Sequence, residues 1–235
     1  MAIKRFYHSS EAQFSPSEVE SFVAKYGNDI LIGGDPGHED FERTMEACDK
    51  NWVYKHVYLV GPGMMSWSAE ERDEIRRNAR SVGIDTNSSD WQDRWYKQGG
   101  WEKKVYEWFT AYNSKLFYSA EIDNLDSVWE QDPNQYMSFI LRFQNFANRN
   151  KIRTKLMLKN LNEEQLEALT KAFASGQVRK DLIAEFGMFE EGSGDNRAIM
   201  RLCKDIGIVA VTPLNGMQPT TRYATAREGI PYFTT

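Results

Sequence analysis

The stretch LFYSAEIDNLD, residues 116–126, begins as an apolar run of strand length and ends in a group of polar side chains. Because side chains alternate along a strand, Glu121 and Asp123 share one face with Ser119. Carboxylates that are buried only for stability are costly unless they are paired. We therefore interpret this stretch as a strand whose carboxyl end carries a functional site. The alternative is an ordinary strand-to-helix turn, where Asp and Asn are common.

Outward from this stretch, apolar runs of strand length alternate with longer segments of helical period. The predicted strands lie at 4–8, 29–34, 56–60, 116–122, 154–158, 182–186 and 208–212. The predicted helices lie at 15–26, 38–51, 68–82, 101–112, 133–148, 162–173 and 196–206, and residues 223–233 would complete the structure. Residues 83–98 are irregular and polar and receive no assignment. Regular alternation predicts a parallel sheet with helical crossovers.

The polar residues at the strand ends favour a closed barrel over an open sheet. An open sheet concentrates its ligands at one switch point, whereas a barrel gathers all its strand ends around one site. Polar or turn residues follow six of the predicted strands: Asp35, residues 61–63, Asp123, Lys159–Asn160, Glu185 and Asn215. We therefore expect an α/β fold with a single (β/α)8 TIM-type barrel over residues 1–235, which includes an irregular or incomplete unit.

The composition fits a soluble globular protein, with 41% hydrophobic and 27% charged residues. The net charge is −5 and the basic residues are dispersed, which argues against nucleic acid as a partner. No apolar run approaches the roughly 20 residues of a membrane span. The first residues lack the apolar core of a secretion signal. We expect a protein made in the cytoplasm and released by lysis, or one numbered as a mature form.

Motifs for cofactors and metals are not found in the sequence. The turn at residues 61–63 lacks the spacing of a phosphate loop, and neither GxSxG nor HExxH occurs. The three His are dispersed, so we expect neither a metal site nor a cofactor. Cys48 and Cys203 are expected to be buried small hydrophobes. Glycoside hydrolysis is the reaction class that needs two carboxylates and no cofactor.

Glu185 is the candidate for the second carboxylate, because it lies within the apolar run of residues 182–186. Burial there would favour the protonated form that a general acid requires. The alternative is that Glu185 pairs with a lysine such as Lys159. Glu190 would replace Glu185 as the acid if the strand register differs. Lys159 itself could instead be a solvated residue at a helix entry.

Three segments occur in an order that resembles glycoside hydrolase family 114. They are residues 121–126, 158–160 and 181–185, which match the family pattern of E-x-D-N-x-D, then L-K-N, then a Glu on the following strand. The resemblance covers roughly residues 115 to 190. The family's glutamate usually stands one residue further from the preceding Asp than Glu185 stands from Asp181. The family's neighbouring cysteines and secretion signal are also missing here, which leaves the sugar open.

The resemblance implies a (β/α)8 barrel with endo-α-1,4-polygalactosaminidase-like activity on an amino-sugar polysaccharide such as galactosaminogalactan. Asp123 corresponds to the family's catalytic Asp and Glu185 to its catalytic Glu. The residues expected to bind the polysaccharide are Glu121, Asn124, Asp126, Lys159, Asn160, Asp35, Tyr7 and His8. Two alternatives stay open: a phage-lysin-like hydrolase of bacterial cell-wall glycan, and a carbohydrate-binding barrel without catalysis.

Overall fold

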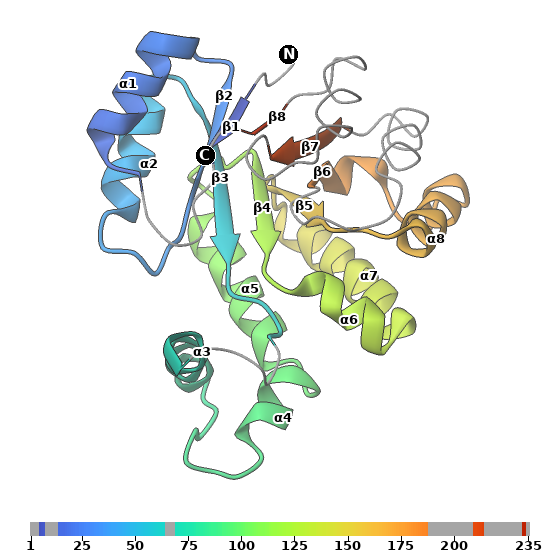
Figure 1. Cartoon of the computed structure of the whole chain (residues 1–235). Helices are drawn as coiled ribbons and strands as arrows, with labels where there is room; N and C mark the ends of the chain where they lie inside the picture. Colours follow the sequence, from blue (N-terminus) through green and yellow to red (C-terminus); the bar gives the residue numbers. More distant parts are fainter. Residues whose placement is uncertain (1–4, 8–13, 64–68, 188–208, 214–231, 234–235) are drawn as a thin grey trace. The chain divides into compact units, whose positions relative to one another are not determined.

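The computed structural model describes residues 5–7, 14–63, 69–187, 209–213 and 232–233 (Figure 1). Its strands close into a barrel in chain order, which confirms the predicted α/β barrel. Parallel pairing runs from β4 through β8 and on through β1 and β2 to β3. The strands are β1 (Arg5–Tyr7), β2 (Ile30–Gly34), β3 (Tyr54–Leu59), β4 (Ser119–Ile122), β5 (Lys155–Lys159), β6 (Ile183–Gly187), β7 (Val209–Pro213) and β8 (Tyr232–Phe233).

The helices agree with most of the predicted segments and add two short ones. They are α1 (Pro16–Tyr26), α2 (Phe41–Lys50), α3 (Ala69–Ser81), α4 (Trp91–Tyr96), α5 (Gly100–Tyr112), α6 (Leu125–Gln131), α7 (Pro133–Asn150) and α8 (Glu163–Ala174). The stretch at residues 83–98 contains α4, and α6 follows β4 directly. Both helices are too short to show a helical period in the sequence. The helix predicted at 196–206 lies outside the described residues.

The chain falls into two compact units. Unit 1 consists of residues 1–58, 116–121 and 154–235, and it holds α1, α2, α8 and most of the barrel strands. Unit 2 consists of residues 59–115 and 122–153, and it holds α3 to α7. That residues 1–235 form a single domain therefore stays a prediction.

The core of unit 1 shows which face of each strand points into the barrel. Ile30 and Ile32 pack with buried residues of α1 and α2, among them Val19 and Cys48. The alternate residues of β2 therefore face the barrel interior. One of them, Gly33, is in register with His56 on β3. It follows that His56 and, two residues later, Tyr58 also point inward.

Cys48 behaves as the sequence predicted, because it is a fully buried free thiol. Burial raises its pKa to about 12, so the thiol stays protonated and unreactive at neutral pH. Cys203 lies outside the described residues.

Helix starts in both units follow ordinary capping rules. Ser15 forms a capping box with Glu18 at the start of α1, and Asn162 does the same with Gln165 at the start of α8. Asp132 caps α7, whose first residue is proline.

The core of unit 2 lies between α5 and α7 and is largely aromatic. The Trp101 and Phe139 rings lie 4.8 Å apart, as do the rings of Phe109 and Phe143. Glu102 on α5 accepts hydrogen bonds of 2.9 Å from two nitrogens of Arg142 on α7. None of the described helices combines the length and apolar character needed to cross a bilayer.

Candidate active site

A polar cluster lies inside the barrel of unit 1, around Glu121. Only 1% of the Glu121 side chain is exposed, and its Oε1 lies 3.0 Å from Lys159 Nζ. Glu121 Oε2 lies 3.5 Å from His56 Nε2. The other ring nitrogen of His56, Nδ1, is 2.8 Å from Ser119 Oγ. Three strands, β3, β4 and β5, thus supply one connected group of buried polar side chains.

Strand register explains why these residues meet. Ser119 is level with Lys155, and Glu121 is level with Met157. Lys159 follows two residues after Met157 and therefore points to the same side of the sheet. Its long side chain can reach back to the carboxylate. Lys159 is consequently not the solvated residue of the alternative interpretation, since only 14% of its side chain is exposed.

The charges of the cluster are balanced. Burial lowers the pKa of His56, and the charge of Lys159 lowers it further, whereas Glu121 acts in the opposite direction. Because burial has the largest effect, His56 is neutral at pH 7. The Lys159 ammonium stabilises the Glu121 carboxylate and also lies 5.8 Å from the centre of the Tyr58 ring. The cluster therefore holds one compensated ion pair beside a neutral imidazole.

Sequence reasoning did not find His56. It lies in an apolar run, and its partners Ser119 and Glu121 are more than 60 residues further along the chain. One signal was present: a single polar residue at an inward position of a strand, opposite a glycine that leaves room for it.

In unit 2, Asp123 is fixed by its backbone and by its neighbour. Its amide donates to the Leu59 carbonyl oxygen at 2.8 Å, and Asn124 Nδ2 donates to Asp123 Oδ2 at 2.9 Å. Asn124 has φ +54°, in the left-handed region that Asn tolerates better than most residues. Asn124 therefore orients the Asp123 carboxylate. The half-buried Asp123 thus has one carboxylate oxygen held at the start of α6.

Gly61 lies against the backbone of Asp123. A Cβ at Gly61 would overlap the Asp123 carbonyl oxygen and would stand 2.8 Å from its carbonyl carbon. Only glycine therefore fits at this position without moving the backbone. The Gly-Pro-Gly turn after β3, which the sequence placed among the strand-end segments, supports the position of Asp123.

The other predicted site residues are placed as follows. Asp126 is in the first turn of α6, and Asn160 follows β5 with φ +54°. Asp35 accepts a hydrogen bond from the Gly37 amide at 2.7 Å and so forms a turn after β2. Tyr7 is on β1, level with Ile32. His8 and Glu190 lie outside the described residues.

Glu185 is placed by its backbone alone. It lies on β6 and is in register with Met157, which is itself in register with Glu121. The three residues thus stand at one level of the barrel, on adjacent strands. The structure brings together Glu121 and Lys159 in unit 1, and Asp123 and Asn124 in unit 2. The pairing of Asp123 with Glu185 in catalysis stays a prediction.

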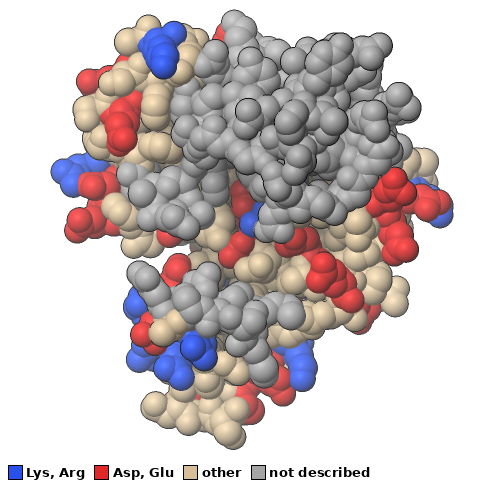
Figure 2. All heavy atoms as spheres, in the orientation of Figure 1, with Lys and Arg blue, Asp and Glu red and all other residues tan. Residues whose placement is uncertain are grey.

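Neither the surface charge nor the arrangement of possible metal ligands identifies a further site among the described residues. On the face shown in Figure 2, acidic and basic side chains are interspersed over the described part. Among the described residues, no group of three or more His, Cys, Asp or Glu is arranged to hold a metal ion.

Comparison with known proteins gives a likeness in structure only. No family model and no curated protein matches the chain. The glycoside hydrolase domain of PelA from Pseudomonas aeruginosa is 13% identical, with a TM-score of 0.55 over 98% of this chain and 93% of that one. A single-residue variant of that domain is 14% identical, with a TM-score of 0.56 and the same coverage. Ega3 of Aspergillus fumigatus, in complex with galactosamine, is 10% identical, with a TM-score of 0.51 over 100% and 91% of the two chains.

The fold is a TIM-type barrel. At these identities the likeness shows the fold and does not by itself assign an activity. It extends over almost the full length of each of the chains compared.

Proposed function

We propose that this protein is an endo-acting glycoside hydrolase, which cleaves internal bonds of a galactosamine-containing polysaccharide. The observation that carries the proposal is the position of Asp123, directly after the carboxyl end of β4 and two residues beyond a buried carboxylate. Active sites of TIM-type barrels lie at the carboxyl ends of the strands. The likeness to the PelA hydrolase domain and to the galactosamine complex of Ega3 supports the same class of substrate.

In this proposal Asp123 is the nucleophile or stabilises the positive charge that develops on the sugar. The hydrogen bond from Asn124 Nδ2 fixes the orientation of the Asp123 carboxylate for that task. Glu185 is the acid and base that protonates the leaving oxygen and activates water. A carboxyl separation of about 5–5.5 Å fits these roles and retention of configuration, whereas at roughly 6.5–9.5 Å the configuration is inverted, Asp123 activates the water and Glu185 acts as the acid alone.

The buried cluster would act on the substrate through Glu121 and Lys159. Lys159 is the partly exposed member of the pair, so its ammonium is the group able to reach a sugar hydroxyl. Glu121 keeps that ammonium in place. Asp126, Asn160 and Asp35 would supply further hydrogen bonds to hydroxyl or amino groups. The acidic residues would also attract a partly deacetylated, cationic glycan.

The test is the release of reducing ends from galactosaminogalactan. We expect release by the unsubstituted chain and at most a trace with Asp123→Asn or Glu185→Gln. Equal release by all three proteins would end the assignment. Bacterial cell walls serve as the comparison substrate, because the sequence left cell-wall cleavage open. Faster cleavage of cell walls than of galactosaminogalactan would also contradict the proposal.

A further inference from the structure

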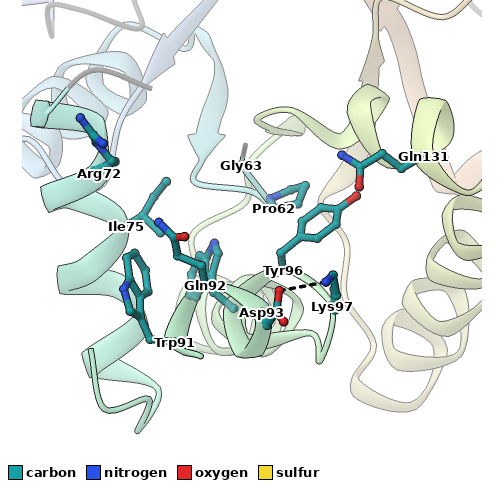
Figure 3. A pocket seen from close by; sticks show the side chains of 11 residues that line it. Pro62, Gly63, Arg72, Ile75, Trp91, Gln92, Asp93, Tyr96, Lys97 and Gln131 are labelled. Atoms are coloured by element: carbon teal, nitrogen blue, oxygen red, sulfur yellow. Dashed lines mark ion pairs between the residues drawn. The ribbon is translucent and has the colours of Figure 1, made fainter. Parts of the chain in front are cut away.

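Unit 2 contains a pocket that the proposed chemistry does not use. Its volume is about 280 Å³, and it lies between α3, α4 and the turn after β3, with Gln131 at the end of α6 (Figure 3). Small-molecule sites typically span about 300–1,000 Å³. The pocket lies just below that range, so it has room for a single ring rather than a chain segment.

Aromatic rings and amides together line this pocket. Trp91, Trp95 and Tyr96 come from α4, and the amides of Gln92 and Gln131 are the uncharged polar groups. In Figure 3 the hydroxyl end of Tyr96 points toward Gln131. A pyranose ring has apolar C–H faces and a rim of oxygens, which suits flat amphipathic rings combined with a few placed polar groups.

Two buried donors in the pocket lining lack an acceptor within the described part of the chain. They are Trp95 Nε1 and Tyr96 Oη. Trp95 is only 2% exposed, so bulk water does not readily accept a hydrogen bond from its Nε1. Burial raises the pKa of Tyr96, and Asp132 raises it further, so the hydroxyl keeps its proton at neutral pH. Buried donors normally have a partner. A ligand that brings oxygens to this pocket would satisfy both.

The charges around the pocket select against a cationic ligand. Asp93 and Lys97 form an ion pair of 3.0 Å, drawn as a dashed line in Figure 3, and largely cancel each other. Arg72 is the remaining charged residue of the lining, which therefore carries a net charge of about +1, while Asp132, whose charge acts on Tyr96, lies outside the lining. A free amino sugar carries an ammonium group and would be repelled. An N-acetylated sugar is neutral, and its carbonyl oxygen is a good acceptor.

We propose that this pocket binds one uncharged N-acetylated sugar unit of the polysaccharide. The inference rests on the proposed function, because the ring is taken to belong to the substrate. The pocket would then hold acetylated units, while the acidic residues after the strands attract deacetylated ones. Tyr96 and Trp95 would donate to the sugar, and the rings of α4 would pack on its faces.

The test measures binding without turnover. The full chain carrying Asp123→Asn is titrated with N-acetylgalactosamine and, separately, with galactosamine, and ligand-observed NMR gives each Kd. We expect saturable binding of N-acetylgalactosamine and at least about fivefold weaker binding of galactosamine. Adding Tyr96→Phe should weaken N-acetylgalactosamine binding about fivefold, since one hydrogen bond is lost. Gln92→Ala, at a half-buried position, should weaken it as well.

The matched control is Tyr112→Phe, which removes a hydroxyl from α5 outside the pocket lining and should leave the Kd unchanged. Three results would each overturn the proposal. Binding of N-acetylgalactosamine could fail to saturate, both pocket variants could bind it with an unchanged Kd, or galactosamine could bind as tightly as N-acetylgalactosamine. The two proposals fail separately. If Asp123→Asn keeps full hydrolytic activity, the proposed function fails whatever the binding result. If hydrolysis depends on Asp123 but the pocket variants bind normally, only this inference fails.

Discussion

Lys159 Nζ lies 3.0 Å from Glu121 Oε1, and the Glu121 side chain is almost completely removed from solvent. The two residues come from adjacent strands and are 38 residues apart in the chain (159 minus 121). A buried carboxylate of this kind is tolerable only because its partner is present. The pair is therefore both a condition for a stable barrel and a candidate part of the sugar site.

Lys159→Met should be strongly destabilising, because it leaves the buried Glu121 carboxylate without its cation. We expect the free energy of unfolding to fall by about 3–5 kcal/mol, as measured by urea denaturation. Adding Glu121→Gln should recover part of the loss. The control is Lys171→Met, which removes an exposed ion pair with Glu167 and should change stability little. Similar effects of the two lysine substitutions would contradict the buried-pair interpretation.

His56 should make stability depend on pH near and below about 6.5, the pKa of an unfolded histidine. Its pKa in the folded chain is lowered, so the unfolded chain takes up the proton first as the pH falls. Stability is therefore greatest above the unfolded pKa of about 6.5 and decreases below it, by at most about 1.4 kcal/mol per pH unit for one proton. The groups that face the ring are Glu121, Lys159 and Ser119. In His56→Gln the free energy of unfolding should vary less over this range, and an unchanged slope would count against burial as the cause.

Gly61→Ala should impair activity through the backbone of Asp123. The added Cβ would overlap the Asp123 carbonyl oxygen, so the backbone must move. Displacing a catalytic group by about 1 Å can cost about 10²-fold in rate, and we expect a loss of that order in kcat. Gly27→Ala is the control, because that glycine has φ +77° but no atom within 4 Å of the added Cβ. It should reduce stability and leave kcat unchanged. Normal kcat in Gly61→Ala would show that Asp123 is not held by this contact.

Asn124→Gly should separate catalysis from folding. Glycine adopts the left-handed φ of +54° without strain, so the turn is retained while the hydrogen bond to Asp123 is lost. A hydrogen bond to a charged group contributes about 1.5–3 kcal/mol, so kcat should fall at least about tenfold with little change in melting temperature. Lys151→Gly, at another left-handed residue, is the matched control and should keep full activity. Equal kcat values of the two variants would contradict the assignment of Asn124 to the active site.

Most of the barrel could be predicted from sequence because the strands are apolar and the helices are periodic. β2 and α1 differ from their predicted limits by a single residue at one end. The short helices α4 and α6 were not predicted, because six or seven residues do not complete two helical turns and so show no helical period in the sequence. The polar residues after the strands predicted a shared site, and within it the structure shows the hydrogen bond from Asn124 to Asp123.

The buried cluster could not be predicted in full, because it depends on strand register. The sequence around His56 does not indicate Ser119 or Glu121 as its partners. The contacts of His56 with these two residues form only when β3 and β4 are aligned. The sequence left open that Lys159 is a solvated residue at the start of a helix. The strand register of β4 and β5, which places Lys159 on the same side of the sheet as Glu121, decides against this. The roles of Glu185 and Tyr7 stay predictions, because only their backbone positions on β6 and β1 are described.

The most direct test of the central claim is kcat/KM on galactosaminogalactan for the unsubstituted chain, Asp123→Asn and Asp132→Asn. Asp132 caps α7, and Asn caps a helix as well as Asp does, so Asp132→Asn changes an acid to an amide outside the proposed chemistry. We predict a loss of at least about 10³-fold for Asp123→Asn, the scale of a missing catalytic carboxylate, and no loss for Asp132→Asn. Equal kcat/KM for the unsubstituted chain and Asp123→Asn, or equal losses in the two variants, would contradict the account.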